Sequence, residues 1–214
     1  MLARVRISVP DRPGSLGVVT SAIGAAGANI LEIDVLESEA GRALDDVFVT
    51  VRNSTHLLAV RDRLESLLGV TVVGIQHPAP PVGGHADLAL LDQVLTHPDR
   101  GLQTLVDGAP HAFGADWGAL VQYGAHGMLE SVLTTSPLCP GADSVVVLAP
   151  LRVASIRMTP PGGDAPYGGT ALVPIGSGPL ALVVVRADGP EFHRSELWRL
   201  GQVGQIIGTV LAPV

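Results

Sequence analysis

The sequence contains no lysine and only one cysteine, Cys139. All 13 basic residues are therefore arginines, which excludes Schiff-base chemistry and phosphate binding through a lysine. A single cysteine cannot form an internal disulfide, and this fits a reducing compartment. Aromatic residues make up only 3% of the chain, so its core must consist mainly of aliphatic side chains.

Clustered positive charge and long apolar runs are also missing. The net charge is −7, whereas a nucleic-acid-binding surface requires clustered cations. The longest apolar stretches, such as residues 180–185, are too short to span a bilayer. The N-terminus has no signal-peptide core or cleavage site. We therefore expect a cytoplasmic globular protein that has no nucleic-acid or membrane partner.

Residues 77–85 interrupt the chain with three prolines and two glycines. This composition fits neither a helix nor a strand, so we interpret it as a linker. It separates a first domain, residues 1–76, from a second domain, residues 86–214.

The first domain is predicted to have the order β-α-β-β-α-β. Its alternating strands lie at 2–9, 29–37, 44–52 and 70–75, and its amphipathic helices at 15–26 and from about 54 to 68. Alternation in the second strand places Ile30, Glu32 and Asp34 on one face and Leu31, Ile33 and Val35 on the other. Ser54 or Thr55 is expected to cap the second helix. This order predicts a ferredoxin-like α+β fold with two helices on one face of a four-stranded antiparallel sheet.

Three segments of this domain carry a family resemblance: Asp11–Gly17 after the first strand, Gly27–Ile30 at the start of the second, and the valine-rich third strand. With them, residues 4–76 resemble an ACT domain, a small regulatory module attached to many enzymes of amino-acid metabolism. The resemblance implies that two copies pair and bind an amino acid between this loop of one copy and the second strand of the other. The implied site is Asp11, Arg12, Pro13, Gly14, Ser15, Leu16 and Asn29.

The chemistry of these residues fits a small zwitterion. Pro13 presets the helical φ and Gly14 permits close approach of the backbone. The first-turn N–H groups at the positive end of the helix are suited to a carboxylate. Asp11 can accept from an α-amino group, and Asn29 can both donate and accept. The alternative is that Pro13-Gly14 is only a turn and Asn29 only the beginning of a strand.

The second domain is predicted to be α+β. Helices are expected at 87–96, 102–113 and 195–211, with Leu88, Leu91 and Leu95 in register in the first of them, and strands at 117–123, 128–135, 144–148, 153–158, 171–175 and 180–186. Residues 86–213 resemble a divergent GAF domain, a sensory fold related to PAS, through the segments 171–175, 178–186 and 190–197. The resemblance implies a central antiparallel sheet and names no ligand.

Other polar and glycine motifs receive structural interpretations. His85 and Asp87 are too few for a metal site, and Asp45-Asp46 is interpreted as a solvated start of a strand. Nothing in the local sequence activates Cys139 as the nucleophile of a Cys–His pair, and the chain has no nucleophile elbow or Walker loop. We therefore expect no enzymatic activity, no cofactor and no metal.

Helix packing is the expected role of Gly201, Gly204 and Gly208, which share one side of the last helix. The partner would be the helix at 87–96 or the same helix of a second subunit. Trp198 is interpreted as a packing residue.

Two functions follow from the sequence. The first is a non-catalytic regulator, a homodimer that binds an amino acid or similar small carboxylate at the ACT seam and responds allosterically. The alternative is a ligand-free scaffold or partner-binding subunit that acts on another enzyme or on a transcription factor.

Overall fold

The computed structural model describes residues 1–77, 82–147 and 149–211, and it divides into two compact units, Met1–Gly84 and His85–Val214. The predicted linker, residues 77–85, includes residues 78–81, which lie outside the described part, so its limits stay a prediction. Among the described residues, no helix is long and apolar enough to cross a membrane.

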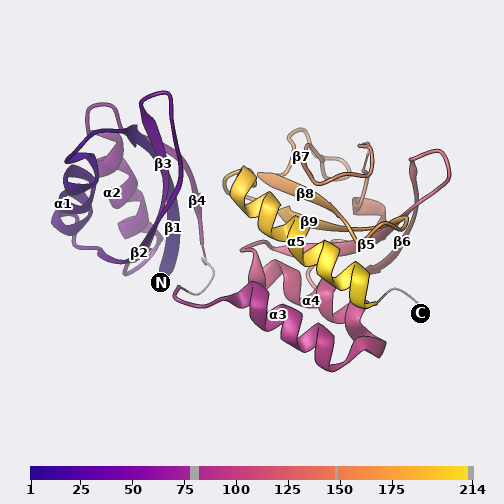
Figure 1. Cartoon of the computed structure of the whole chain (residues 1–214). Coiled ribbons are helices and arrows are strands. Elements are labelled where there is room, and N and C mark those ends of the chain that lie inside the picture. The colour runs from indigo at the N-terminus through magenta and orange to yellow at the C-terminus, as the bar shows by residue number, and fades with distance from the viewer. Residues whose placement is uncertain (78–81, 148, 212–214) are drawn as a thin grey trace. The chain divides into compact units, whose positions relative to one another are not determined.

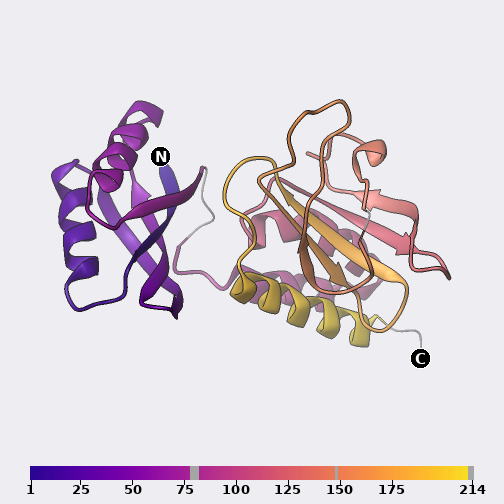
Figure 2. The ribbon, with the colours of Figure 1, turned by 90° about the horizontal axis from the view of Figure 1, so that it is seen from above.

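The first unit is a four-stranded antiparallel sheet with two helices on one face (Figures 1 and 2). Its elements are β1 (Leu2–Pro10), α1 (Ser15–Ala25), β2 (Asn29–Glu39), β3 (Arg42–Thr50), α2 (Ser54–Glu65) and β4 (Thr71–Gln76). The strands lie in the order β2-β3-β1-β4, and all three pairings are antiparallel. The predicted βαββαβ fold is thereby confirmed.

Aliphatic side chains fill the space between this sheet and its helices. Val19 and Ile23 of α1 and Val60 and Leu64 of α2 are fully buried, as the three-four spacing predicts. They pack against a sheet face that includes Val47. Gly27 follows α1 with φ of 81°, the left-handed conformation typical of a helix end.

Two local predictions for this unit are wrong. The alternation in β2 fails because the register shifts between Ile30 and Glu32 and again between Val35 and Glu37. Ile30 therefore packs on the core with Ile33, as expected where a bulge reverses the faces. The cap of α2 is Asn53, whose side chain accepts a 2.9 Å hydrogen bond from the backbone N–H of His56.

The second unit combines a five-stranded antiparallel sheet with three α-helices (Figure 1). The helices are α3 (Ala86–Thr96), α4 (Gly101–Ala112) and α5 (Arg194–Val210), and the strands are β5 (Trp117–Tyr123), β6 (Leu129–Thr135), β7 (Ala154–Ile156), β8 (Gly169–Pro174) and β9 (Leu180–Arg186). The strands lie in the order β6-β5-β9-β8-β7, which confirms the predicted central antiparallel sheet.

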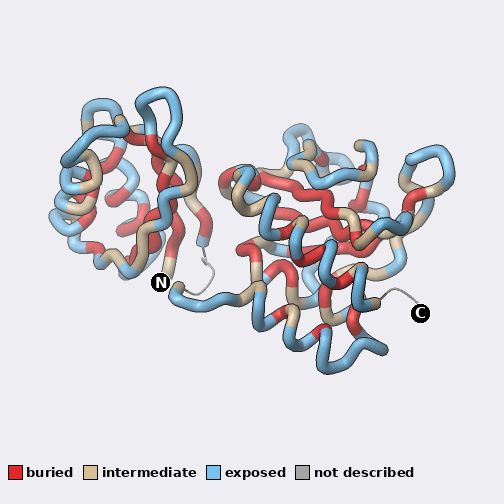
Figure 3. The backbone as a smooth tube through the Cα atoms, in the orientation of Figure 1, coloured by how far each residue is buried: buried red, intermediate tan, exposed pale blue. Residues whose placement is uncertain are grey.

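Both faces of this sheet are covered (Figure 3). Leu182 and Val184 of β9 belong to the cluster shared with the helices, whereas Val183 and Val185 belong to a cluster on the opposite face. That opposite cluster also contains Val145, Val147 and Met158 from the segment between β6 and β8. This arrangement explains why the apolar run of β9 is continuous: successive side chains are buried in apolar clusters on opposite faces of the sheet.

Three predictions for the second unit need correction. The strand expected at 144–148 does not form among its described residues: Ala142–Ser144 is a 3-10 helix, and Val145 and Val147 are buried outside any strand; Leu148 lies outside the described part. The face of α3 that enters the core carries Leu90 and Val94, with Leu91 packed beside them, whereas Leu88 and Leu95 are exposed. Trp198 is 66% exposed and is therefore not a core packing residue.

Gly204 and Gly208 of α5 pack against a strand and its following turn, and Gly201 packs against the side chain of Val153, so none of the three packs against another described helix. A Cβ atom on Gly204 would lie 2.4 Å from the carbonyl oxygen of Pro174, and one on Gly208 would lie 2.2 Å from the nitrogen of Gly176. The backbone of Gly176 also donates a 3.2 Å hydrogen bond to the oxygen of Gly204. These glycines thus allow α5 to lie directly on β8 and the turn to β9.

Candidate functional site

The predicted ligand loop, residues 11–14, is a tight connection between β1 and α1. The backbone N–H of Asp11 donates to the oxygen of Gly41 over 2.9 Å, and the N–H of Ser15 donates to the oxygen of Arg12 over 3.2 Å. Gly14, with φ of 91°, stands at the N-cap position of α1. The loop is therefore held against the β2–β3 hairpin and delivers a positive-φ glycine to the beginning of the helix.

The first turn of α1 has free donors. No side chain caps it, and it contains no acidic residue. Among the described residues, no acceptor is found for the backbone N–H groups of Leu16 and Gly17, whereas the N–H of Ser15 is already used. The donors available to an anion are thus fewer than the sequence predicts, but they lie at the positive end of the helix.

Charged side chains flank these donors. Asp11 accepts a hydrogen bond from the hydroxyl of Ser38 over 2.5 Å, so its carboxylate is oriented toward the end of β2. Arg12 is exposed, and its guanidinium has no partner among the described residues. A surface hollow between α1 and α2 begins at the same loop and is lined by Gly14, Gly17, Val18, Ser21, Ala22, Ala25, Arg63 and Leu67. Sequence reasoning missed Arg63, because nothing in its sequence context places it beside α1.

Asn29 lies at the other end of the sheet. The residue pairs with Thr50 at the beginning of β2, whereas the loop follows Pro10, which pairs with Arg42. The 11 residues of α1 separate the two ends, a span of roughly 16 Å at the helical rise per residue. One copy of the chain therefore brings Asp11, Arg12, Pro13, Gly14, Ser15 and Leu16 together and leaves Asn29 apart from them.

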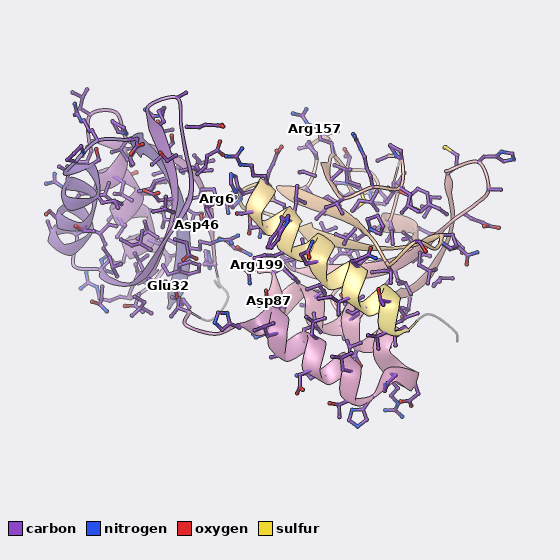
Figure 4. The ribbon with its side chains drawn as sticks, in the orientation of Figure 1. Arg6, Glu32, Asp46, Asp87, Arg157 and Arg199 are labelled. Carbon is purple, nitrogen blue, oxygen red and sulfur yellow. The ribbon has the colours of Figure 1, made fainter. Side chains whose placement is uncertain are left out.

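Asp45 and Asp46 are both buried, so their interpretation as a solvated strand start is wrong. Asp46 lies on the sheet face away from the helices and accepts two hydrogen bonds from Arg6, of 2.7 and 2.8 Å (Figure 4). Asp45 lies on the opposite, helix-facing side, and neither of its carboxylate oxygens has a partner among the described residues. Burial, followed by the charges of Asp46 and Asp11, raises the pKa of Asp45.

The polar motifs of the second unit have structural roles. Asp87 pairs with Arg199, with 2.8 Å between Oδ2 and Nη2 (Figure 4). Burial opposes the ionisation of Asp87, but the hydrogen bond and charge of Arg199 hold its pKa below the ordinary value. Within residues 1–77, 82–147 and 149–211, no three His, Cys, Asp or Glu side chains gather in a way that could hold a metal ion. The thiol of Cys139 lies 3.5 Å from the oxygen of Gly141, beside the apolar cluster.

Several known proteins are similar to one or the other of the two units. The family model described as ACT domain matches residues 3–69. The ACT domain of GTP pyrophosphokinase from Chlorobium tepidum is 25% identical, with a TM-score of 0.30 over 36% of this chain and 95% of that chain. The GAF domain of the Acinetobacter phosphoenolpyruvate-protein phosphotransferase is 13% identical, with a TM-score of 0.42 over 60% of this chain and 94% of that chain.

A further similar structure spans nearly the whole chain. The ligand-free regulatory subunit of aspartate kinase from Thermus thermophilus is 13% identical, with a TM-score of 0.29 over 94% of this chain and 91% of that chain. No curated protein matches the chain.

Proposed function

We propose that the first unit, an ACT domain by the match over residues 3–69, binds an amino acid or a similar small carboxylate and makes this chain a regulatory protein. The uncapped start of α1 carries this proposal. Leu16 and Gly17 present free N–H groups to an anion, and the charged side chains of Asp11 and Arg12 lie in the adjoining loop. Such an arrangement binds a ligand that has charges of both signs.

The ligand site is completed by a second copy of the chain. β2 is an edge strand of the sheet, and edge strands offer unpaired backbone groups for pairing. A twofold axis that pairs β2 with its own copy in antiparallel fashion brings the beginning of one strand opposite the end of the other. Asn29 of one copy then approaches Ser38 and Asp11 of its partner, although the two ends are far apart within one chain.

Regulation follows if the ligand binds one dimer geometry better than another. A ligand that contacts both copies at the seam has a different affinity for each arrangement of the copies, and this difference biases their equilibrium. The regulated protein would be another polypeptide, and no catalytic step is assigned to this chain.

A partner-binding subunit is the second candidate function. It is favoured by apolar side chains that remain exposed on neighbouring helices of the second unit, notably Leu88 on α3 and Trp198 on α5. Large exposed apolar side chains on neighbouring helices are typical of a surface that contacts another protein.

A thermal-shift screen of the twenty amino acids tests the proposed function, because a ligand that binds only the folded state raises the melting temperature. We expect a shift for one or a few amino acids with the wild type and its loss in Asn29→Ala. The exposed Gln202 provides the control, since Gln202→Ala removes a carboxamide from the second unit. If no amino acid shifts the wild type, the amino-acid-binding function is wrong and the partner-binding function remains.

A further inference from the structure

Asp45 places a carboxyl group inside the first unit, where no described residue is a hydrogen-bond partner for it. Its residue exposure is 0%, and neither Oδ1 nor Oδ2 finds a donor among the described residues. The cross-strand neighbours of Asp45 are Ile7 on β1 and Val35 on β2. A carboxylate in such surroundings is strongly disfavoured unless a positive charge or several donors accompany it.

The charges that act on Asp45 are all negative. They are Asp46 on its own strand, which is committed to Arg6 on the other face, and Asp11 in the β1–α1 loop. The flanking positions on β1 and β2 are apolar, and α1 contains no ionisable residue. Asp11 accepts a hydrogen bond from Ser38, whose cross-strand partner Ala43 lies two residues before Asp45 on the same face of β3, so the buried carboxyl group lies near the predicted ligand loop.

A structural role does not account for this residue. Alternate positions of the same strand carry Val47 and Val49, which are fully buried in the core. A valine at position 45 would continue this row and remove the cost of burying an acid. A metal ion is not favoured either, because the described residues do not gather a third ligand around this pair of acids.

We propose that the Asp45 carboxylate, assisted by Asp11, binds the ammonium group of the ligand at the ACT seam. This inference rests on the proposed function. It identifies the residue that binds the ammonium group of the zwitterion, which the N–H groups at the start of the helix cannot bind. The free N–H groups of Leu16 and Gly17 take the carboxylate of the ligand. Asp45 and Asp11 bind the ammonium group of the ligand. The positive charge of the ligand thereby neutralises the negative charge of Asp45, which no side chain of the described residues compensates.

Access to Asp45 lies at the β2 edge. Val35, its neighbour on the helix-facing side, is 59% exposed, so α1 does not cover this part of the sheet. The hydrogen bond between Asp11 and Ser38 lies at the same edge and must open for the ammonium group to pass. Ligand binding would thus move the loop against the β2–β3 hairpin, which is where a second copy pairs in the proposed dimer.

Proton release accompanies this binding. Because its pKa is raised, Asp45 holds a proton more readily than an exposed aspartate, and the arriving ammonium group favours the ionised form. The proton leaves to solvent, so affinity rises with pH until Asp45 is fully ionised in the free protein. An amine that has lost its charge gains nothing from this site.

Thermal-shift and calorimetric titrations of the full chain with the twenty amino acids and their N-acetyl derivatives test the inference. The variants are wild type, Asp45→Asn and the control Asp62→Asn, which makes the same change at an exposed position of α2. We expect Asp45→Asn to weaken amino-acid binding about tenfold or more, the usual consequence of losing a charged hydrogen bond. Because the pKa of Asp45 is raised, affinity should rise as pH increases above the ordinary aspartate pKa for wild type and Asp62→Asn only, and N-acetyl derivatives should not bind.

The outcomes separate the two proposals. If wild type binds an amino acid and Asp45→Asn binds it equally well, with the same pH dependence, the role of Asp45 is wrong and the seam function stands. Equal binding of the N-acetyl derivatives would overturn the role of Asp45 as well. If wild type binds none of the probes, the proposed function and this inference fail together.

Discussion

Arg186 and Asp45 are both buried charged residues, but they differ in their hydrogen-bond partners. Arg186 is fully buried, but its guanidinium donates to the oxygens of Phe113 and Gly114 over 2.8 Å each and lies 2.6 Å from the carboxylate of Glu196. It stacks on the ring of Phe192 as well, with its Cζ 3.8 Å from the ring centroid. Arg186 thereby joins the ends of α4, β9 and α5. Asp45 has no such partners in the described part of the chain, which is why it is a candidate for binding and Arg186 is not.

The unpartnered carboxyl group of Asp45 makes the ligand-free protein less stable at neutral pH. Its folded-state pKa is raised above the unfolded value, so the folded state binds the proton more tightly. Stability from this group is therefore fully present below the unfolded pKa, at about pH 3, and is lost as pH rises through the folded pKa. Asp45→Asn should raise the free energy of unfolding by about 1–3 kcal/mol at neutral pH and by little at the acidic limit.

Urea unfolding at several pH values measures this difference. The exposed Asp62→Asn should track wild type throughout, because its carboxyl group gains no buried environment on folding. A constant difference between wild type and Asp45→Asn at all pH values would show that the carboxyl group of Asp45 does not titrate as described. Together with the binding test, a stabilised but binding-deficient Asp45→Asn is the combination typical of a functional residue.

The sequence alone could not identify Asp45. Two adjacent acids at a strand start are usually solvated, and successive strand residues face opposite sides of the sheet, so one of the pair had to enter a covered face. Only the tertiary structure reveals that Asp45 faces the helix-bearing side of the sheet and is fully buried there. Only a weak feature of the sequence indicated that Asp46 is buried. Arg4 and Arg6 of β1 alternate along their strand, and paired strands can place opposite charges side by side.

At the scale of elements, α5 depends on glycines that helix propensity disfavours. Gly208→Ala would place a Cβ atom 2.2 Å from the nitrogen of Gly176 and should destabilise the protein by about 1–3 kcal/mol through forced movement of α5. In α1, a Cβ atom on Gly24 meets nothing within 4 Å, so Gly24→Ala should stabilise by roughly 0.5–1 kcal/mol. Thermal or urea unfolding of both variants tests this, and a Gly208→Ala variant as stable as wild type would show that α5 does not pack so closely.

Most helices and strands could be predicted because the spacing of their apolar residues fits either a helix or a strand, but not both. The ranges of β5 and β9 agree to the residue with the prediction, and the other predicted elements that formed differ by a few residues at their ends. Prediction failed where an apolar run is neither helix nor strand, as at residues 145–147, of which Val145 and Val147 are buried against the second sheet and Val146 is exposed. It also failed on α3, where apolar residues occupy more than one face and only packing selects Leu90 and Val94.

At the scale of the whole molecule, each unit has its own core, and the proposed seam concerns the first unit alone. The two edges of its sheet are β2 and β4. Each exposes an apolar side chain: Leu31 on β2 is 46% exposed, and Val73 on β4 is 50% exposed. The register shifts around Leu31 and Leu36 leave residues 32–35 as the regular stretch of β2. The ACT resemblance and the position of Asn29 favour β2 as the strand that pairs.

The matched pair Leu31→Arg and Val73→Arg distinguishes the two edges. With Asn29 of one copy opposite Ser38 of the other, Leu31 lies close to Leu36 of the partner across the twofold axis, so Leu31→Arg would bury an unpaired guanidinium against an apolar side chain at a cost of several kcal/mol. We expect wild type and Val73→Arg to sediment as dimers and Leu31→Arg as a monomer, with unchanged circular dichroism in all three because both side chains are exposed. Dissociation by Val73→Arg alone would move the seam to β4. Asn29 would then be remote from the loop of the partner, and the ligand would have to be bound by the loop, Arg63 and Asp45 of a single copy.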